Sequence, residues 1–164
     1  MKRKKKGNLF KQDRARIFKD KRGDPYQQKQ KLPDPTLCPN CGAVFTKGRW
    51  SWEPIEFVEN EKLCPACQRI EDGYPAGFVE VEGDFYQTHR EEILHLFRNL
   101  EEQEAQEHPM ERIMRITEED GKTVITTTGM HLPRMIGDAL KNSYQGDLEI
   151  SYDAESIARV HWVR

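Results

Sequence analysis

The sequence predicts an α+β protein in which a four-cysteine zinc unit with a basic N-terminal arm precedes a helix and an antiparallel sheet. Three observations support this fold class. All four cysteines lie in two C-x2-C pairs about twenty residues apart, a spacing typical of a tetrahedral metal site. Apolar periodicity further along the chain changes from helical to alternating. Charged residues make up 33% of the chain, which leaves few residues for one large apolar core. Small units stabilised by a bound metal ion fit this composition better.

Composition and periodicity divide the chain into four segments. They are a basic disordered arm at 1–36, a zinc-binding unit at 37–79, a connecting amphipathic helix at 80–108, and an α+β sheet unit at 109–164. No apolar run approaches the ~18–20 residues of a membrane span. The basic N-terminus also lacks the apolar core of a signal peptide, so we expect a cytoplasmic protein in a reducing compartment.

The arm carries a charge opposite to that of the rest of the chain. Residues 1–31 contain thirteen Lys or Arg and three Asp, for a net charge of +10, whereas the remainder has a net charge of −12. An arm with so few apolar residues is expected to be disordered alone. It suits nucleic-acid phosphates, whose neutralisation releases counterions. A solubilising tail or a localisation signal is the alternative interpretation.

Basic side chains of the arm and of the following hairpin are the RNA-binding residues that we predict. They are Lys2, Arg3, Lys4, Lys5, Lys6, Lys11, Arg14, Arg16, Lys19, Lys21, Arg22, Lys47 and Arg49. Aromatic residues beside the last two, Phe45, Trp50 and Trp52, have the composition of a base-stacking surface. In a domain this small, aromatic residues more often form the core, and we favour that interpretation.

The cysteines predict a structural zinc site. Its ligands are Cys38 and Cys41, followed by the permissive Gly42, and then Cys64 and Cys67. Four thiolates close the shell of a tetrahedral ion and leave no position for a reactive water. A redox pair would need a thioredoxin-like context, and a disulfide framework would need a secreted chain.

Short elements around the cysteines predict a treble-clef-like unit. Two strands, Ala43–Thr46 and Arg49–Trp52, flank a turn at Lys47-Gly48. A short helix after the second cysteine pair is expected to end at Gly73. A first pair on a turn, a hairpin, and a second pair at a helix start together form the layout of a treble clef.

The next segment predicts one amphipathic helix, Thr88–Glu107. Thr88 and Glu91 form a capping signature at its start, and Pro109 follows its end. Its apolar face is formed by Ile93, Leu96, Phe97 and Leu100.

The last segment has the element order ββαββ. A hairpin is expected around Glu119–Gly121, a helix over the apolar stripe Met135–Leu140, and two strands at Leu148–Tyr152 and Ile157–Val163. This order predicts a four-stranded antiparallel sheet with one helix on a face, and the preceding helix covering part of the same sheet.

Motifs for catalysis are absent from the sequence. It has no phosphate loop, dinucleotide fingerprint, zinc-protease motif or nucleophile elbow, so we expect neither an enzyme nor a small-molecule substrate. The stretch Thr126–Arg134 combines hydroxyls, a histidine and an arginine where a helix begins, which suits an anion. We favour a simpler interpretation, with Thr128 or Gly129 capping the helix and Pro133 in its first turn.

Three stretches, Leu37–Gly42, Cys64–Cys67 and Thr126–Ala139, together resemble a family of small bacterial proteins with a basic N-terminal arm. That family resembles, more distantly, the zinc-binding N-terminal part of the NMD-type adaptor that escorts the large ribosomal subunit in eukaryotes. This chain has two C-x2-C pairs where the adaptor carries more, and it lacks export-signal segments. The resemblance implies a ribosomal or RNA partner, with the four cysteines as metal ligands.

These observations together predict a non-catalytic zinc protein that binds ribosomal or other structured RNA. Its arm would follow phosphates, and its acidic body would face outward or contact a protein such as a ribosomal protein. Ribosome assembly or stress are the processes in which such a protein would act. The alternative is a protein–protein adaptor whose basic tail is an accessory.

Overall fold

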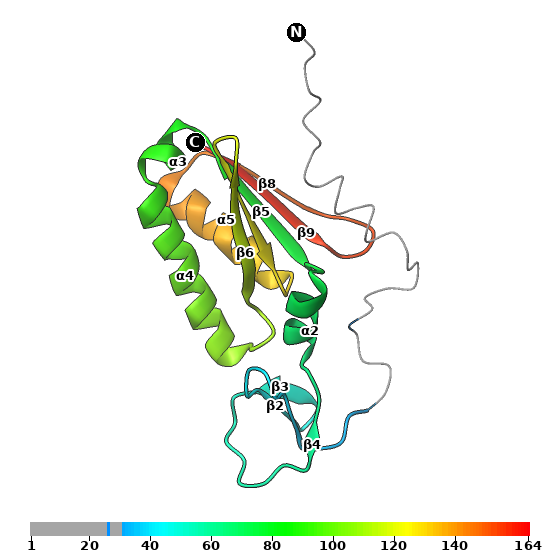
Figure 1. Ribbon diagram of the computed structural model, residues 1–164. Helices are drawn as coiled ribbons and strands as arrows, with labels where there is room; N and C mark the ends of the chain where they lie inside the picture. The colour runs from blue at the N-terminus through cyan, green and yellow to red at the C-terminus, as the bar shows by residue number, and fades with distance from the viewer. Residues whose placement is uncertain (1–25, 27–30) are drawn as a thin grey trace.

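The computed structural model describes Tyr26 and residues 31–164, which form two sheets joined by a short helix (Figure 1). The first unit contains β1 (Thr36–Leu37), β2 (Val44–Thr46), β3 (Arg49–Ser51), β4 (Asn60–Glu61) and α2 (Pro65–Asp72). Its strands lie in the order β3-β2-β1-β4. The predicted hairpin is confirmed, because β2 pairs antiparallel with β3 through a turn in which Lys47 and Gly48 have positive φ. The predicted end of α2 at Gly73 is also confirmed.

The first unit begins earlier in the chain than the sequence predicts. Leu32 is buried in its core, and Thr36 lies in β1, opposite Phe45 of β2. The proposed arm, 1–36, therefore includes residues at its C-terminal end that belong to the folded unit. Residues 1–25 and 27–30, with eleven of the predicted RNA-binding side chains, lie outside the described part of the chain.

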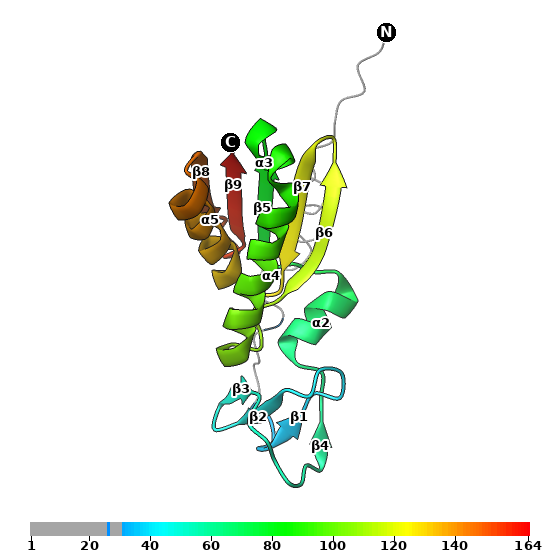
Figure 2. The ribbon, with the colours of Figure 1, turned by 90° about the vertical axis from the view of Figure 1, so that its left-hand side faces the viewer.

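The second unit is a five-stranded sheet with helices on one face (Figure 2). Its elements are β5 (Gly77–Glu82), α3 (Asp84–Thr88), α4 (Arg90–Glu107), β6 (Ile113–Glu119), β7 (Lys122–Thr127), α5 (His131–Tyr144), β8 (Asp147–Tyr152) and β9 (Ala158–Val163). The strand order is β6-β7-β5-β9-β8. Large side chains from the strands and from all three helices, including Tyr86, Phe97 and Trp162, are fully buried between the two layers.

The prediction of a four-stranded antiparallel sheet is wrong, because β5 forms a fifth, central strand. This strand lies between the two hairpins, antiparallel to β7 and parallel to β9. It buries Phe78 on one face and Val79 and Val81 on the other, as a central strand must. The predicted segment boundary between residues 79 and 80 falls inside β5. The α+β class is as predicted, and the last five elements follow in the order β6, β7, α5, β8 and β9.

The start of the long helix also differs from the prediction. Thr88 ends α3, and its hydroxyl donates to the carbonyl of Asp84 (3.0 Å) instead of capping α4. Helix α4 begins at Arg90 without a side-chain cap. Its predicted apolar stripe is confirmed at Ile93 and Phe97, which are fully buried against the sheet.

Candidate metal centre

The four cysteines lie together at one end of the first unit. Cys38 and Cys41 occupy the turn after β1, Cys64 is the N-cap of α2, and Cys67 is in the first turn of that helix. All four sulfur atoms lie within 4.8 Å of one another. The structure therefore brings together the complete set of cysteines that the sequence predicts as ligands.

Backbone amides around the cysteines point at the sulfur atoms. The amide of Ala43 donates to Sγ of Cys41 (3.4 Å), and the amide of Cys64 donates to Sγ of Cys38 (3.3 Å). The amide of Cys67 donates to Sγ of Cys64 (3.4 Å), which places that sulfur at the positive end of α2. Such donors stabilise thiolates, which are the form that binds a metal.

The pKa values of the thiols show two opposing influences. Burial raises the pKa of Cys64 and of Cys41. Burial acts in the same direction on Cys38, but backbone hydrogen bonds from Cys64 and Cys41 outweigh it and lower the pKa of Cys38 to about 7. Buried thiolates need a compensating cation, because an isolated charge is costly away from water.

Arg112 supplies one cation from outside the cysteine unit. Its guanidinium donates to Cys41 (3.2 Å), Cys64 (3.4 Å) and Cys67 (3.4 Å), and Nε donates to the carbonyl of Pro109 (2.6 Å). Hydrogen bonds to these sulfurs and their charges outweigh burial and raise the pKa of Arg112 further. The sequence does not point to Arg112, because this residue lies 45 positions beyond Cys67 and no spacing rule connects the two.

The geometry of the cluster fits a tetrahedral metal ion. Metal–thiolate bonds of about 2.3 Å place neighbouring ligand sulfurs about 3.8 Å apart in a tetrahedron. The sulfurs of Cys41 and Cys64 are 3.8 Å apart. With four protein ligands the shell is complete, so the donor set suits an ion that holds the fold and does not react with substrate.

The backbone of Arg112 fixes the metal centre to the second unit. Its amide donates to the hydroxyl of Thr128 (2.9 Å), and its carbonyl accepts the amide of Thr128 (2.9 Å). The same hydroxyl donates to the carbonyl of Met110 (2.6 Å). Thr128 is therefore engaged with residues 110–112, and the prediction that it caps α5 is wrong.

Glu111, the neighbour of Arg112, supplies the cap of α5. Its buried carboxylate accepts the amide of Leu132 (3.0 Å) in the first turn of the helix. Gly129 does not cap the helix either: it leaves room for Glu111, because a Cβ at position 129 would lie 2.1 Å from that carboxylate. The prediction that Pro133 lies in the first turn is confirmed. The Glu111 carboxylate thus accepts a free amide at the start of α5 that an external anion would need as a donor.

Burial raises the pKa of Glu111 above its ordinary value of 4.5, against an opposing hydrogen bond from Leu132. The folded state then holds this proton to a higher pH than the unfolded chain does. We therefore expect the free energy of unfolding to fall as the pH rises from 4.5 through the folded-state pKa. Urea denaturation at a series of pH values should show that Glu111→Gln removes this fall. The exposed Glu102→Gln is the control, and an unchanged pH profile in Glu111→Gln would contradict the expectation.

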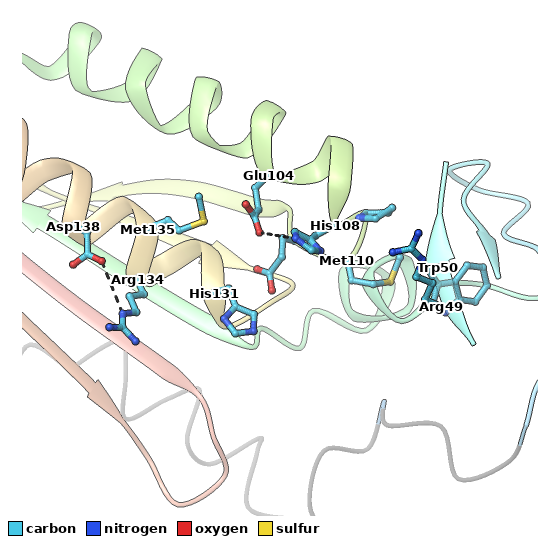
Figure 3. A pocket seen from close by; sticks show the side chains of 11 residues that line it. Arg49, Trp50, Glu104, His108, Met110, His131, Arg134, Met135 and Asp138 are labelled. Atoms are coloured by element: carbon cyan, nitrogen blue, oxygen red, sulfur yellow. Dashed lines mark ion pairs between the residues drawn. The ribbon is translucent and has the colours of Figure 1, made fainter. Parts of the chain in front are cut away.

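A pocket of about 620 Å³ lies where the two units meet (Figure 3). Its lining residues come from β3, the end of α4, residues 109–111 and the first half of α5. Arg49 lies at one end of the pocket and Arg134 at the other, with His131 between them. Arg134 is 3.9 Å from Asp138, and His108 is 3.8 Å from Glu104. The lining of the pocket thus combines arginine, histidine and acidic side chains with the apolar Trp50, Met110 and Met135.

The two predicted RNA-binding residues of the hairpin are both exposed, but only Arg49 lines the pocket. Lys47 is highly exposed and lies 3.5 Å from Glu53. Phe45 and Trp50 pack edge to face in the core of the unit, which confirms the core interpretation for these two residues. Trp52 is exposed, and its indole donates to the carbonyl of Ala105 in α4 (2.5 Å).

A second group of ionisable side chains lies on β5 and β9. Glu80, Glu82 and His161 have ligand atoms close enough to share an ion. The ammonium of Lys122 already lies 2.8 Å from Glu80 and 3.6 Å from Glu82. This group is therefore an ion-pair network with its own cation.

None of the helices in the described part of the chain combines the length and the apolar character of a membrane span. Comparison of the chain with known proteins gives no match to a protein-family model, to a curated protein or to a solved structure.

Proposed function

We propose that this is a non-catalytic zinc protein that binds ribosomal or other structured RNA through its basic N-terminal segment. Zinc is the ion that best suits four thiolates, because it favours a tetrahedral shell and has no redox chemistry. We infer that the turn with the first cysteine pair, the hairpin, and the helix that starts at the second pair make this unit a treble clef. The metal would hold this unit rigid.

The observation that carries the proposal is the fixed root of the basic segment. The hydroxyl of Tyr26 donates to Asp72 at the end of α2 (2.6 Å), and the guanidinium of Arg69 lies 4.4 Å from the centre of its ring. Leu32 is buried in the core around the cysteines. The segment 1–31, which has a net charge of +10, is therefore attached to the metal unit at its C-terminal end. A cationic segment joined to a folded metal unit is suited to contacting phosphates.

Exposed basic side chains of the folded part extend the same surface chemistry. Lys47 and Arg49 lie on the hairpin turn and the strand beside it, and His131 and Arg134 lie on the other side of the pocket. RNA held by the basic segment would meet these groups next. The resemblance of the cysteine region to ribosomal adaptors implies a ribosomal or RNA partner, and we propose an assembly or stress role in the cytoplasm.

Replacing the eleven Lys and Arg between positions 2 and 22 with Gln should weaken RNA binding and flatten its salt dependence. Each lost phosphate contact lowers the slope of log K against log salt by about 0.7–0.9. Fluorescence anisotropy with labelled ribosomal RNA fragments, measured across a salt series, gives both quantities. An unchanged affinity and slope would refute the RNA-binding role of the segment.

The hairpin is tested separately with a matched pair of variants. Lys47→Gln with Arg49→Gln should weaken RNA binding, whereas Arg98→Gln with Lys141→Gln, two exposed cations of α4 and α5, should not. Equal losses in the two pairs would indicate an unspecific charge effect and remove the hairpin from the interface.

A protein–protein adaptor is the second candidate function. Its support is the acidic character of residues 32–164, which carry a net charge of −12 and are repelled by RNA, together with apolar side chains exposed beside β3. In this function the basic segment adds affinity for an acidic partner. Salt-sensitive sedimentation with ribosomes favours the first candidate, and a ribosome-free pool favours the second.

A further inference from the structure

The loop between β3 and β4, residues 52–59, exposes an unusual set of apolar side chains; we refer to it as the acidic loop. Phe57 is 73% exposed, and Trp52 and Ile55 are 41% and 37% exposed. Three of the six exposed large apolar residues in the described part of the chain therefore lie within six positions. Clustered exposure of this kind marks an interaction surface, whereas isolated exposed apolar residues do not.

Acidic side chains alternate with these apolar ones. The loop carries Glu53, Glu56 and Glu59 and contains no Lys or Arg. Among residues 31–164, Glu53 pairs with Lys47 at 3.5 Å, and neither Glu56 nor Glu59 has a basic partner. The negative charge of the loop is therefore available to a partner.

The base of the acidic loop is fixed while its tip projects. Trp52 donates to the carbonyl of Ala105 in α4, and the guanidinium of Arg112 lies 5.8 Å from the centre of its ring. Pro54 restricts the backbone next to Ile55. A loop held at its base loses less conformational entropy on binding than a free one.

We propose that the acidic loop is a docking surface for a basic protein, with Ile55 and Phe57 entering an apolar crevice that Lys and Arg side chains surround. Charge decides the kind of partner, because the carboxylates of Glu56 and Glu59, which have no basic partner among residues 31–164, repel the phosphates of RNA and anionic lipids. This inference rests on the proposed function: proteins on the same RNA carry Lys and Arg for its phosphates. The loop would then contact the protein component of an RNA–protein particle while the basic segment contacts the RNA.

Zero-length carbodiimide crosslinking of the full-length, metal-loaded protein tests the inference directly. The probe is the mixture of basic proteins extracted from purified ribosomes of the source organism and freed of RNA. Mass spectrometry of the products should show amide bonds between a loop carboxylate (Glu53, Glu56 or Glu59) and a lysine of a basic protein. The variant with Ile55→Ser and Phe57→Ser should reduce this product about tenfold, because apolar anchors dominate such interfaces.

Ile70→Ser is the matched control, since Ile70 is 42% exposed on α2 but lies outside the loop. Equal product from the loop variant and the control would overturn the inference, as would the absence of any loop crosslink. Crosslinks that reach only lysines in 1–31 of this chain or of a second copy would also overturn it.

RNA affinity of the loop variant is measured in parallel: a variant that keeps RNA binding while losing the crosslink separates this inference from the proposed function. If RNA binding were refuted while the crosslinks stayed intact, only the proposed function would be removed.

Discussion

Cys64→Ser is expected to abolish metal retention and to unfold the first unit while the five-stranded sheet stays folded. Cys64 has three roles in the candidate metal centre. Its sulfur is one of the four candidate ligands and accepts the amide of Cys67 as the N-cap of α2, and its own amide donates to Cys38. Structural zinc contributes about 10–16 kcal/mol of apparent binding energy to small units, and that energy is folding energy. Metal analysis and hydrogen exchange by mass spectrometry measure the two effects.

The second unit is an internal control in the same sample. Its core of strand and helix side chains is separate from the cluster around the cysteines, so its amides should keep their protection. A variant that retains one metal ion per chain and native exchange in residues 36–73 would show that the four thiolates do not hold the unit together.

Arg112→Met should lower metal affinity and the free energy of unfolding without destroying the site. The substitution keeps an apolar stem but removes the donors to Cys41, Cys64 and Cys67 and the cation that faces them. Losing groups that orient metal ligands typically costs about 10–100-fold in affinity. Losing the partner of buried charges costs about 3–5 kcal/mol. Competition with a chelator gives the affinity, and urea denaturation gives the stability.

Two further variants show which property of Arg112 matters. Arg112→Lys keeps the charge but loses the planar fork, so an intermediate effect is expected. Arg115→Met removes an exposed arginine three residues further along the chain and should leave metal affinity unchanged. If Arg112→Met behaved like Arg115→Met, the guanidinium would have no role at the sulfurs.

Features that depend on neighbouring residues could be predicted from the sequence. The grouping of Cys38, Cys41, Cys64 and Cys67 follows from their spacing, because two residues between paired cysteines allow one turn to present both sulfurs. The β2–β3 hairpin and the end of α2 at Gly73 follow from residues that adopt positive φ.

Features that depend on contacts between residues distant in sequence could not be predicted. Strand β5 has an apolar pattern, but only its pairing with β7 and β9 makes it the centre of the sheet. Glu111 caps α5 although it lies twenty-one positions before Leu132, whose amide it accepts. The sequence instead favours a local cap at Thr128 or Gly129. Arg112 reaches the cysteines in the same way.

Glu111 and Arg112 are consecutive residues with opposite orientations: one side chain holds the first turn of α5, and the other holds the thiolates. A single peptide bond thus connects the residue that contacts the thiolates to the residue that lines the pocket. A fluorophore attached near the start of α5 should therefore change its emission when a chelator withdraws the ion, giving an optical reading of metal exchange in the intact protein.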